Sequence, residues 1–179
     1  FSTDFRVRSH SYSPNGVKLQ STEIKEGVVH QTGGVTITAF EVDHGGEQLD
    51  AFGYRINYNG HSVVLSGDTT FNENLIRHAQ GVDLLVHEVP HGMGDGFERP
   101  NLERIRRNHT VPEDAGVVLT RTRPKLAAYT HILLFGDATA EDLVSATRPS
   151  YDGPLVVDDD LVRLEIGERG TIRLHSAAS

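Results

Sequence analysis

Short runs of β-forming residues in the first half of the chain predict strands that follow one another closely. Val35–Val42 alternates such residues and ends at Asp43-His44-Gly45-Gly46, a pattern typical of a strand that leads into a loop. Asn59-Gly60 is the strongest short signal for a hairpin. It joins two predicted strands, Phe52–Tyr58 and Ser62–Ser66, and shorter strand-like pieces precede them at Phe5–Arg8 and Val28–His30.

The second half alternates predicted strands and helices. Continuous apolar runs predict two buried strands, Val82–Val86 ending in His87-Glu88 and Lys125–Tyr129 ending in Thr130-His131. Capping and stop signals predict three helices, which are Asn72–Gln80, Val111–Thr122 with Thr110 as N-cap, and Ala140–Thr147. The remaining segments are interpreted as a Gly-rich loop, Pro90–Pro100, and three closing strands, Leu155–Val157, Leu161–Ile166 and Thr171–Leu174. This order predicts an α/β (α+β) fold with a mixed sheet and helices on one face.

Composition narrows the possible chemistry. The 179 residues fit one domain, and no apolar run is long enough for a transmembrane helix. A formal net charge of −8 disfavours a nucleic-acid partner, because such proteins usually carry a basic surface. Without cysteine, any metal must be held by imidazole and carboxylate groups, which suits Zn²⁺, Mn²⁺ or Fe²⁺. No signal peptide is evident, so the compartment stays open with a cytoplasmic location favoured.

Three metal-competent residues stand at the ends of predicted strands: His44, Asp68 and His131. Alone, each has an ordinary explanation, because an aspartate there is typical of an Asx-turn or helix cap and a loop histidine is usually solvated. Gly67 before Asp68 permits a tight turn and the close approach of another group. Loops held by a rigid sheet often carry chemistry. The joint pattern therefore favours a metal site.

The segments around these residues resemble, in order, the second half of ribonuclease Z-like and arylsulfatase-like proteins of the metallo-β-lactamase superfamily. The resemblance covers roughly residues 35–135 and rests on Phe40–Gly45, Ala51–Ile56, Ser62–Thr69, Leu84–Glu88, Asn108–Thr110 and Tyr129–Ile132. It implies an αββα sandwich, of which this chain supplies mainly the second αβ half as a single partial domain.

The same resemblance implies a binuclear site with two divalent metals, zinc first and manganese or iron as alternatives. His44 would ligate the first metal, Asp68 would bridge both, and His131 would ligate the second. A pair of metals held in this way lowers the pKa of a bridging water and so provides hydroxide at neutral pH.

Catalytic roles also follow from the resemblance. His109 resembles the histidine that such enzymes hold near the scissile group, where it would stabilise developing charge or protonate the leaving group. Glu88 or His87 would orient His109 by a hydrogen bond. An equally simple interpretation makes His87-Glu88 a polar pair that ends a strand.

One motif of the family, His-x-His-x-Asp-His, occurs nowhere in the sequence. Three ligands are few for two metals, since a catalytic zinc normally has three of its own. We therefore expect a missing N-terminal half, or a second chain, to complete the site. Half a sandwich would also leave an apolar sheet face exposed, so association with a complementary half or into a homo-oligomer is expected.

The leading functional hypothesis is metal-dependent hydrolysis of a small-molecule ester, such as an aryl sulfate, phosphodiester or lactone. A ribonuclease Z-type tRNA 3′-end endonuclease is the first alternative. Asn59-Gly60 leaves no room between its flanking strands for the tRNA-gripping arm that one ribonuclease Z subgroup carries there, and the charge also argues against pre-tRNA. The second alternative is an inactive binding module. No membrane partner is expected.

Overall fold

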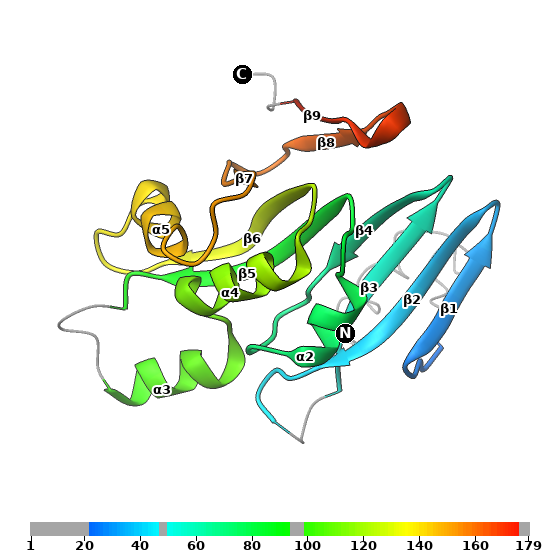
Figure 1. The fold of residues 1–179 in the computed structure, drawn as a ribbon. Coiled ribbons are helices and arrows are strands. Elements are labelled where there is room, and N and C mark those ends of the chain that lie inside the picture. Colours follow the sequence, from blue (N-terminus) through cyan, green and yellow to red (C-terminus); the bar gives the residue numbers. More distant parts are fainter. Residues whose placement is uncertain (1–21, 47–49, 94–98, 176–179) are drawn as a thin grey trace, which may run out of the picture.

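The computed structural model describes residues 22–46, 50–93 and 99–175, and in this part seven strands form one sheet in the order β1 to β7 (Figure 1). The strands are β1 Gly27–Thr32, β2 Val35–Val42, β3 Ala51–Tyr58, β4 His61–Leu65, β5 Leu84–His91, β6 Leu126–Leu134 and β7 Leu155–Val156. Strands β1 to β4 pair antiparallel, whereas β4 to β7 pair parallel. The predicted mixed sheet is therefore confirmed.

Local chemistry explains the antiparallel half. Asn59 and Gly60 both have positive φ, 50° and 78°, as the two-residue hairpin between β3 and β4 requires. The strand-like piece Val28–His30 lies inside β1, and Phe5–Arg8 lies outside the described residues.

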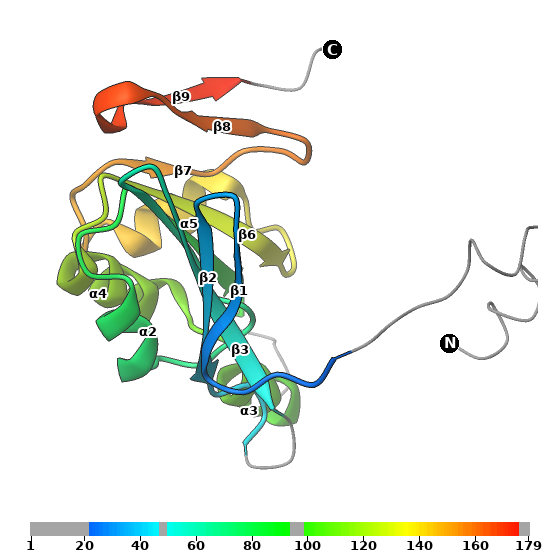
Figure 2. The same ribbon diagram turned by 90° about the vertical axis from the view of Figure 1, so that its right-hand side faces the viewer.

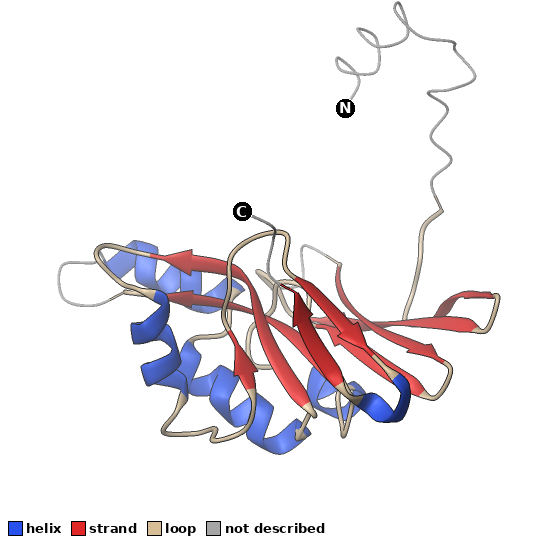
Figure 3. Cartoon of the chain, turned by 90° about the horizontal axis from the view of Figure 1, so that it is seen from above, coloured by secondary structure: helices blue, strands red, loops and turns tan. Residues whose placement is uncertain are grey.

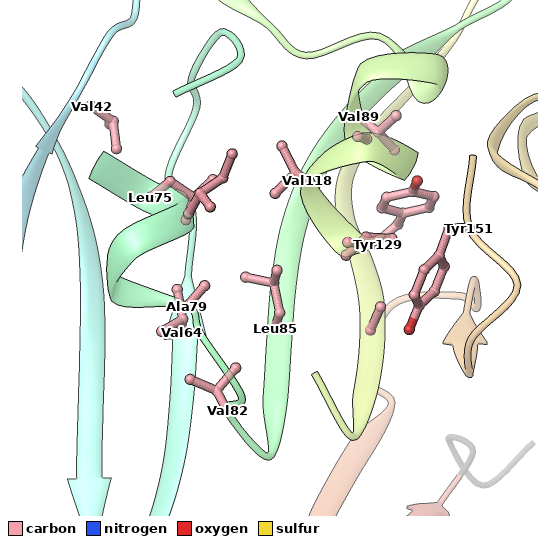
Figure 4. Close-up of a cluster of buried hydrophobic side chains, with 14 of the residues drawn as sticks. Val42, Val64, Leu75, Ala79, Val82, Leu85, Val89, Val118, Tyr129 and Tyr151 are labelled. Carbon is pink, nitrogen blue, oxygen red and sulfur yellow. The ribbon is translucent and has the colours of Figure 1, made fainter. Parts of the chain in front are cut away.

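Helices cover one face of the sheet (Figure 3). They are α2 Glu73–His78, α4 Pro112–Thr122 and α5 Ala140–Thr147, and they pack on β2, on β5 and against one another. The core between these layers is apolar, with Leu75 of α2 and Val118 of α4 fully buried against Val64, Leu85 and Val89 of the strands (Figure 4). Burial of such side chains contributes on the order of 2 kcal/mol each. Helices on one face were expected from the sequence.

Several elements differ from the sequence-based expectation. Helix α3, Arg99–Asn108, was not predicted and begins inside Pro90–Pro100, the segment interpreted as a loop. Strands β5 and β6 run on past their predicted ends, to His91 and Leu134. The predicted N-cap Thr110 is wrong, because Val111 occupies that position without a side-chain cap and Thr110 is hydrogen-bonded elsewhere.

The predicted closing strands beyond β7 form a separate two-stranded antiparallel sheet. Strands β8, Arg163–Ile166, and β9, Ile172–His175, are joined by a 3₁₀ turn at Glu168–Gly170. This hairpin lies beyond the β7 edge (Figures 1 and 2).

The face of the main sheet opposite the helices is open. Apolar side chains of β4 and β5, including Val63, Leu65 and Val86, line a broad groove of about 1220 Å³ whose other wall includes Leu164 and Ile166 of β8. Leu65 is 38% exposed there. None of the helices in the described ranges has the length and hydrophobicity of a membrane-crossing segment.

Candidate metal centre

The sheet topology brings several chain segments to the same end of the sheet. Strands β2 and β4 run in one direction because both are antiparallel to β3, and β5 and β6 are parallel to β4. These four strands therefore end on the same side of the sheet. The loops after β2 and β4 carry His44 and Asp68, His131 lies within β6 itself, and His109 comes from the junction of α3 and α4.

At that end the imidazole and carboxylate groups converge. One ligand atom each from His44, Asp68 and His109 lies within 4.8 Å of the others. His131 Nε2 is 3.5 Å from Asp68 Oδ2, and the His131 ring is 5.6 Å from the His109 ring. The structure thus brings all three predicted metal ligands and the predicted catalytic histidine to one place. Its tightest group contains His109 rather than His131.

His44 is oriented by the helix that the sequence did not reveal. Its Nδ1–H donates to the carbonyl oxygen of Asn108, at 2.7 Å, in the last turn of α3. A hydrogen bond of this kind fixes the tautomer and ring orientation of a ligating histidine. Nε2 of His44 is consequently left as the metal-facing atom.

Asp68 is presented by a turn that only glycine can make. Gly67 has φ of +64°, and a Cβ there would lie 2.6 Å from the Phe52 carbonyl oxygen. Two independent requirements, the left-handed backbone and the close approach of β3, therefore select glycine. The Asp68 side chain is 40% exposed, so a cation and a substrate can both reach it.

His131 sits on a bulge in β6. The pairing with β5 moves from Glu88↔Thr130 to Val89↔Ile132, so His131 is the extra residue, and its φ is +45°. Bulges beside active sites re-aim a side chain, and a positive φ in a residue other than glycine costs roughly 1–3 kcal/mol. The strain falls on the residue that points toward Asp68.

Glu88 holds His109 in place from beneath the site. Its Oε2 lies 3.0 Å from His109 Nδ1, and its Oε1 accepts from the Thr110 backbone N–H at 2.8 Å. Burial raises the pKa of Glu88 to about 8, helped by the nearby charge of Asp68, while burial lowers the pKa of His109. The pair therefore shares a proton between two groups that both resist ionisation. Nε2 of His109 stays available to the site.

His87 does not reach the site, although the sequence left it as an alternative to Glu88. Its ring is fully buried on the helix-covered side, Nδ1–H donates to the Glu88 carbonyl at 2.6 Å, and Nε2 has no partner among the described residues. Burial lowers the pKa of His87 to about 4. The hydrogen bond to His109 that the sequence assigned to either residue belongs to Glu88.

Sequence reasoning missed the residues that join the loops. The Thr110 hydroxyl donates to the Thr69 carbonyl at 2.6 Å, and Ser66 Oγ accepts from the Glu88 N–H at 3.1 Å. The Thr70 N–H donates to the Asp43 carbonyl at 2.8 Å. Partners 22 to 41 residues apart leave no local signal. The signal available in the sequence was that Thr110 stands beside His109 and Ser66 stands two residues before Asp68.

The donor set fits a divalent metal of the zinc type. Imidazole nitrogens and one carboxylate are ligands that Zn²⁺ accepts, and three of them suffice for one catalytic cation with an open position. His44 Nε2, the Asp68 carboxylate and either His109 or His131 would hold that cation. A second cation would need ligands beyond those that converge in the described residues.

Comparison with known proteins shows the family to which the chain belongs. Residues 3–132 match the beta-lactamase superfamily domain. A ribonuclease Z of Mycolicibacterium gilvum is 30% identical over 172 residues, which are 93% of this chain and 58% of that protein. A ribonuclease Z of Haloarcula marismortui is 30% identical over 102 residues, which are 56% of this chain and 31% of that protein. The chain thus spans a little over half the length of the first of these relatives.

Solved structures share the fold at low sequence identity. The metallo-beta-lactamase fold protein YhfI from Bacillus subtilis superposes with a TM-score of 0.57 at 20% identity, over 70% of this chain and 47% of that one. A diphosphatase from the PhnP family gives 0.56 at 17% identity, over 86% of this chain and 52% of that one. The resemblance inferred from the sequence is confirmed: the chain has the metallo-beta-lactamase fold and belongs to the beta-lactamase superfamily.

Proposed function

We propose that the intact protein is a metal-dependent hydrolase of small esters, such as aryl sulfates, phosphodiesters or lactones. The observation that carries this proposal is the convergence of His44, Asp68 and His109 within 4.8 Å at the end of the sheet where four loops emerge. Membership of the beta-lactamase superfamily supports it. The site is open to solvent at Asp68 and His131, whose side chains are 40% and 44% exposed, as a site for an external substrate must be.

We propose zinc as the first choice for two metal ions, and Asp68 as the residue that would be a ligand to both. When bound, such ions would supply Lewis acidity and a water that ionises near neutral pH. The chain's own residues do the rest. Asn108 fixes the direction of His44, and Glu88 fixes that of His109. His109, with a proton available through Glu88, can protonate a leaving oxygen or stabilise its charge.

The open apolar face bears on how the site is completed. Exposed Leu65 and its neighbours form a surface larger than single scattered apolar residues would explain. We propose that a second αβ layer of the full protein packs on this face and brings the remaining metal ligands. A second copy of the chain is the alternative occupant, and sedimentation of the intact protein and of residues 1–179 separates the two.

Metal content and hydrolysis, measured together on the intact protein, test the function. About two metals per chain and turnover of a panel of nitrophenyl esters are expected. Asp68→Ala should lose both metals and activity, since it removes the only carboxylate of the converging set. His109→Ala should lower turnover with metal content unchanged, and His175→Ala, on the exposed β9, is the matched control.

Two outcomes would contradict these assignments. Equal metal loss in the Asp68 and His109 variants would make His109 a ligand, as the tight grouping of its donor atom allows. A metal-free, inactive wild type would point to a binding module instead. A tRNA 3′-end endonuclease is the second candidate, because the relatives from Mycolicibacterium gilvum and Haloarcula marismortui are ribonucleases Z. Cleavage of pre-tRNA without ester turnover would favour it.

A further inference from the structure

Positive charge is concentrated beside the metal centre in a chain that is otherwise acidic. The formal net charge is −8, yet the last two turns of α3 carry Arg104, Arg106 and Arg107 against a single acidic residue, Glu103. This helix lies apart from the layer of α2, α4 and α5, at the end of the sheet where β2 finishes (Figure 1). Its carbonyl at Asn108 orients His44.

A small groove runs between α3 and the loop that carries His44. It has a volume of about 220 Å³ and is lined by Gly45, Glu103, Arg104, Arg107 and Asn108. Helix α3 is hydrogen-bonded to the loop that carries His44, because the Gly45 N–H donates to the Arg107 carbonyl at 3.4 Å. A group bound in the groove would therefore lie one residue from a predicted metal ligand.

Helix geometry selects two of the three arginines. Arg104 and Arg107 are three residues apart and so share one face of α3, whereas Arg106 is turned away by about 100° from Arg107 and does not line the groove. Both groove arginines are exposed, and neither makes an ion pair within the described residues. Arg121, by contrast, is fully engaged by both carboxylate oxygens of Glu73.

We propose that Arg104 and Arg107 bind a phosphate group of the substrate that is separate from the ester being cleaved. Planar guanidinium groups match the oxygens of phosphate in pairs, and two of them on one helix face suit a doubly charged group. Local positive charge on an acidic protein also draws an anionic substrate toward the site. This inference rests on the proposed hydrolase function and narrows it to phosphodiesters that carry a second phosphate.

The first test measures binding and does not depend on turnover. Pyrophosphate is titrated by calorimetry into the metal-depleted intact protein, so that no cation competes for the ligand. We expect the Arg104→Ala/Arg107→Ala double variant to bind about tenfold more weakly than wild type. Arg106→Ala removes the same charge from the same helix outside the groove and should leave the affinity within about twofold. Circular dichroism shows whether each variant keeps its fold.

Either of two binding results overturns the proposal. If Arg106→Ala weakened pyrophosphate binding as much as the matched single variant Arg107→Ala, the effect would come from the overall charge of the helix and not from a specific site in the groove. Unchanged affinity in the double variant would place the anion elsewhere.

A second test uses metal-loaded enzyme and two nitrophenyl phosphodiesters, one bearing a second phosphate and one without it. The double variant should raise KM about tenfold for the first substrate only, with kcat unchanged. If wild type hydrolyses neither ester, the proposed function fails, and the pyrophosphate result still decides the anion site. If wild type hydrolyses both and the double variant behaves like wild type, the anion site fails alone.

Discussion

Two buried carboxyl groups belong to the β5 segment, and their surroundings differ in kind. Asp83, just before the strand, is 4% exposed, and Glu88, in the middle of the strand, is 1% exposed. Asp83 accepts from Lys125 Nζ at 2.6 Å and from the Ser62 N–H at 2.7 Å. The partners of Glu88 are neutral or weakly basic: the backbone N–H groups of Thr69 and Thr110 and the His109 ring.

These different surroundings shift the pKa values of the two carboxyl groups in opposite directions. Burial by itself raises the pKa of Asp83, but the hydrogen bonds from Lys125 and Ser62 and the Lys125 charge outweigh it, so the pKa is lowered. Burial raises the pKa of Glu88 to about 8 because no cation opposes it. A buried carboxyl with its own cation is a structural element that stays ionised. One without a cation exchanges protons near neutral pH, which suits catalysis.

The largest expected effect is that of Glu88→Gln on turnover. The amide can still accept from the Thr110 N–H, so the fold should hold, but it cannot pass a proton to His109. We expect kcat for ester hydrolysis to fall by about 10²–10⁴, the usual range for loss of general acid–base catalysis. Stopped-flow or plate assays of the intact protein measure it. Wild-type turnover in this variant would make Glu88 a mere support for the loop.

Glu88→Gln should also change how the free energy of unfolding depends on pH. A folded-state pKa near 8, against 4.5 for the ordinary group, means that the native state holds a proton that the unfolded state releases between these pH values. Stability contributed by Glu88 is therefore lost as pH rises from 4.5 to 8. Glu88→Gln should flatten that slope in urea unfolding of metal-depleted protein. A slope that survives in the variant would assign it to another group.

His87, which lies between Asp83 and Glu88 in the sequence, is a buried group without an ionic partner. Its pKa is lowered to about 4, so protonation opposes folding and stability is lost as pH falls from 6.5 to 4. The loss amounts to about 3 kcal/mol. His87→Phe should remove most of this acid sensitivity in urea unfolding at pH 7 and 4.5. Val89→Ala, on the same strand and face, is the control, with a loss on the order of 2 kcal/mol at both pH values.

Features that depend on neighbouring residues could be predicted from the sequence. Asn59-Gly60 set the hairpin and Gly67 marked the tight turn before Asp68, because each depends on local backbone conformation. Helix α3 was missed because its two aliphatic residues, Leu102 and Ile105, have helical spacing but stand among charged residues, directly after a Gly-rich stretch.

The assembly of the site was less accessible. His109 does not follow a strand. Its neighbour Thr110 has the sequence context of a helix cap, but its hydroxyl donates to the Thr69 carbonyl, 41 residues away. The resemblance to a family supplied His109 where periodicity could not. Likewise, the bulge that makes His131 the extra residue of β6 can be recognised only from the pairing of β5 with β6.

A smaller effect is expected at Asp83, just before β5. Asp83→Asn keeps the shape but removes the charge that Lys125 and the Ser62 N–H stabilise, and we expect a loss of about 1–3 kcal/mol at pH 7. Because the folded pKa is lowered below 3.8, the lost stability is that present above pH 3.8 and normally lost in acid. Turnover per folded molecule should stay at the wild-type value. A fall in kcat would link Asp83 to the site at Glu88 and break the comparison.

Lys125→Met gives the smallest expected change and isolates what the cation alone does. The Lys125 side chain is 54% exposed, so solvent screens its charge, and we expect a loss of about 1 kcal/mol or less. Gly170 of the 3₁₀ turn lies against the end of the Lys125 side chain, so the variant must also keep the β8–β9 hairpin in place. The informative quantity is the pKa of Asp83, read by carboxyl NMR. Without Lys125 it should rise toward the behaviour of Glu88, because burial then acts with less opposition. If it stays low, the Ser62 N–H is sufficient, and the contrast between the two carboxyl groups lies in backbone hydrogen bonding instead of charge.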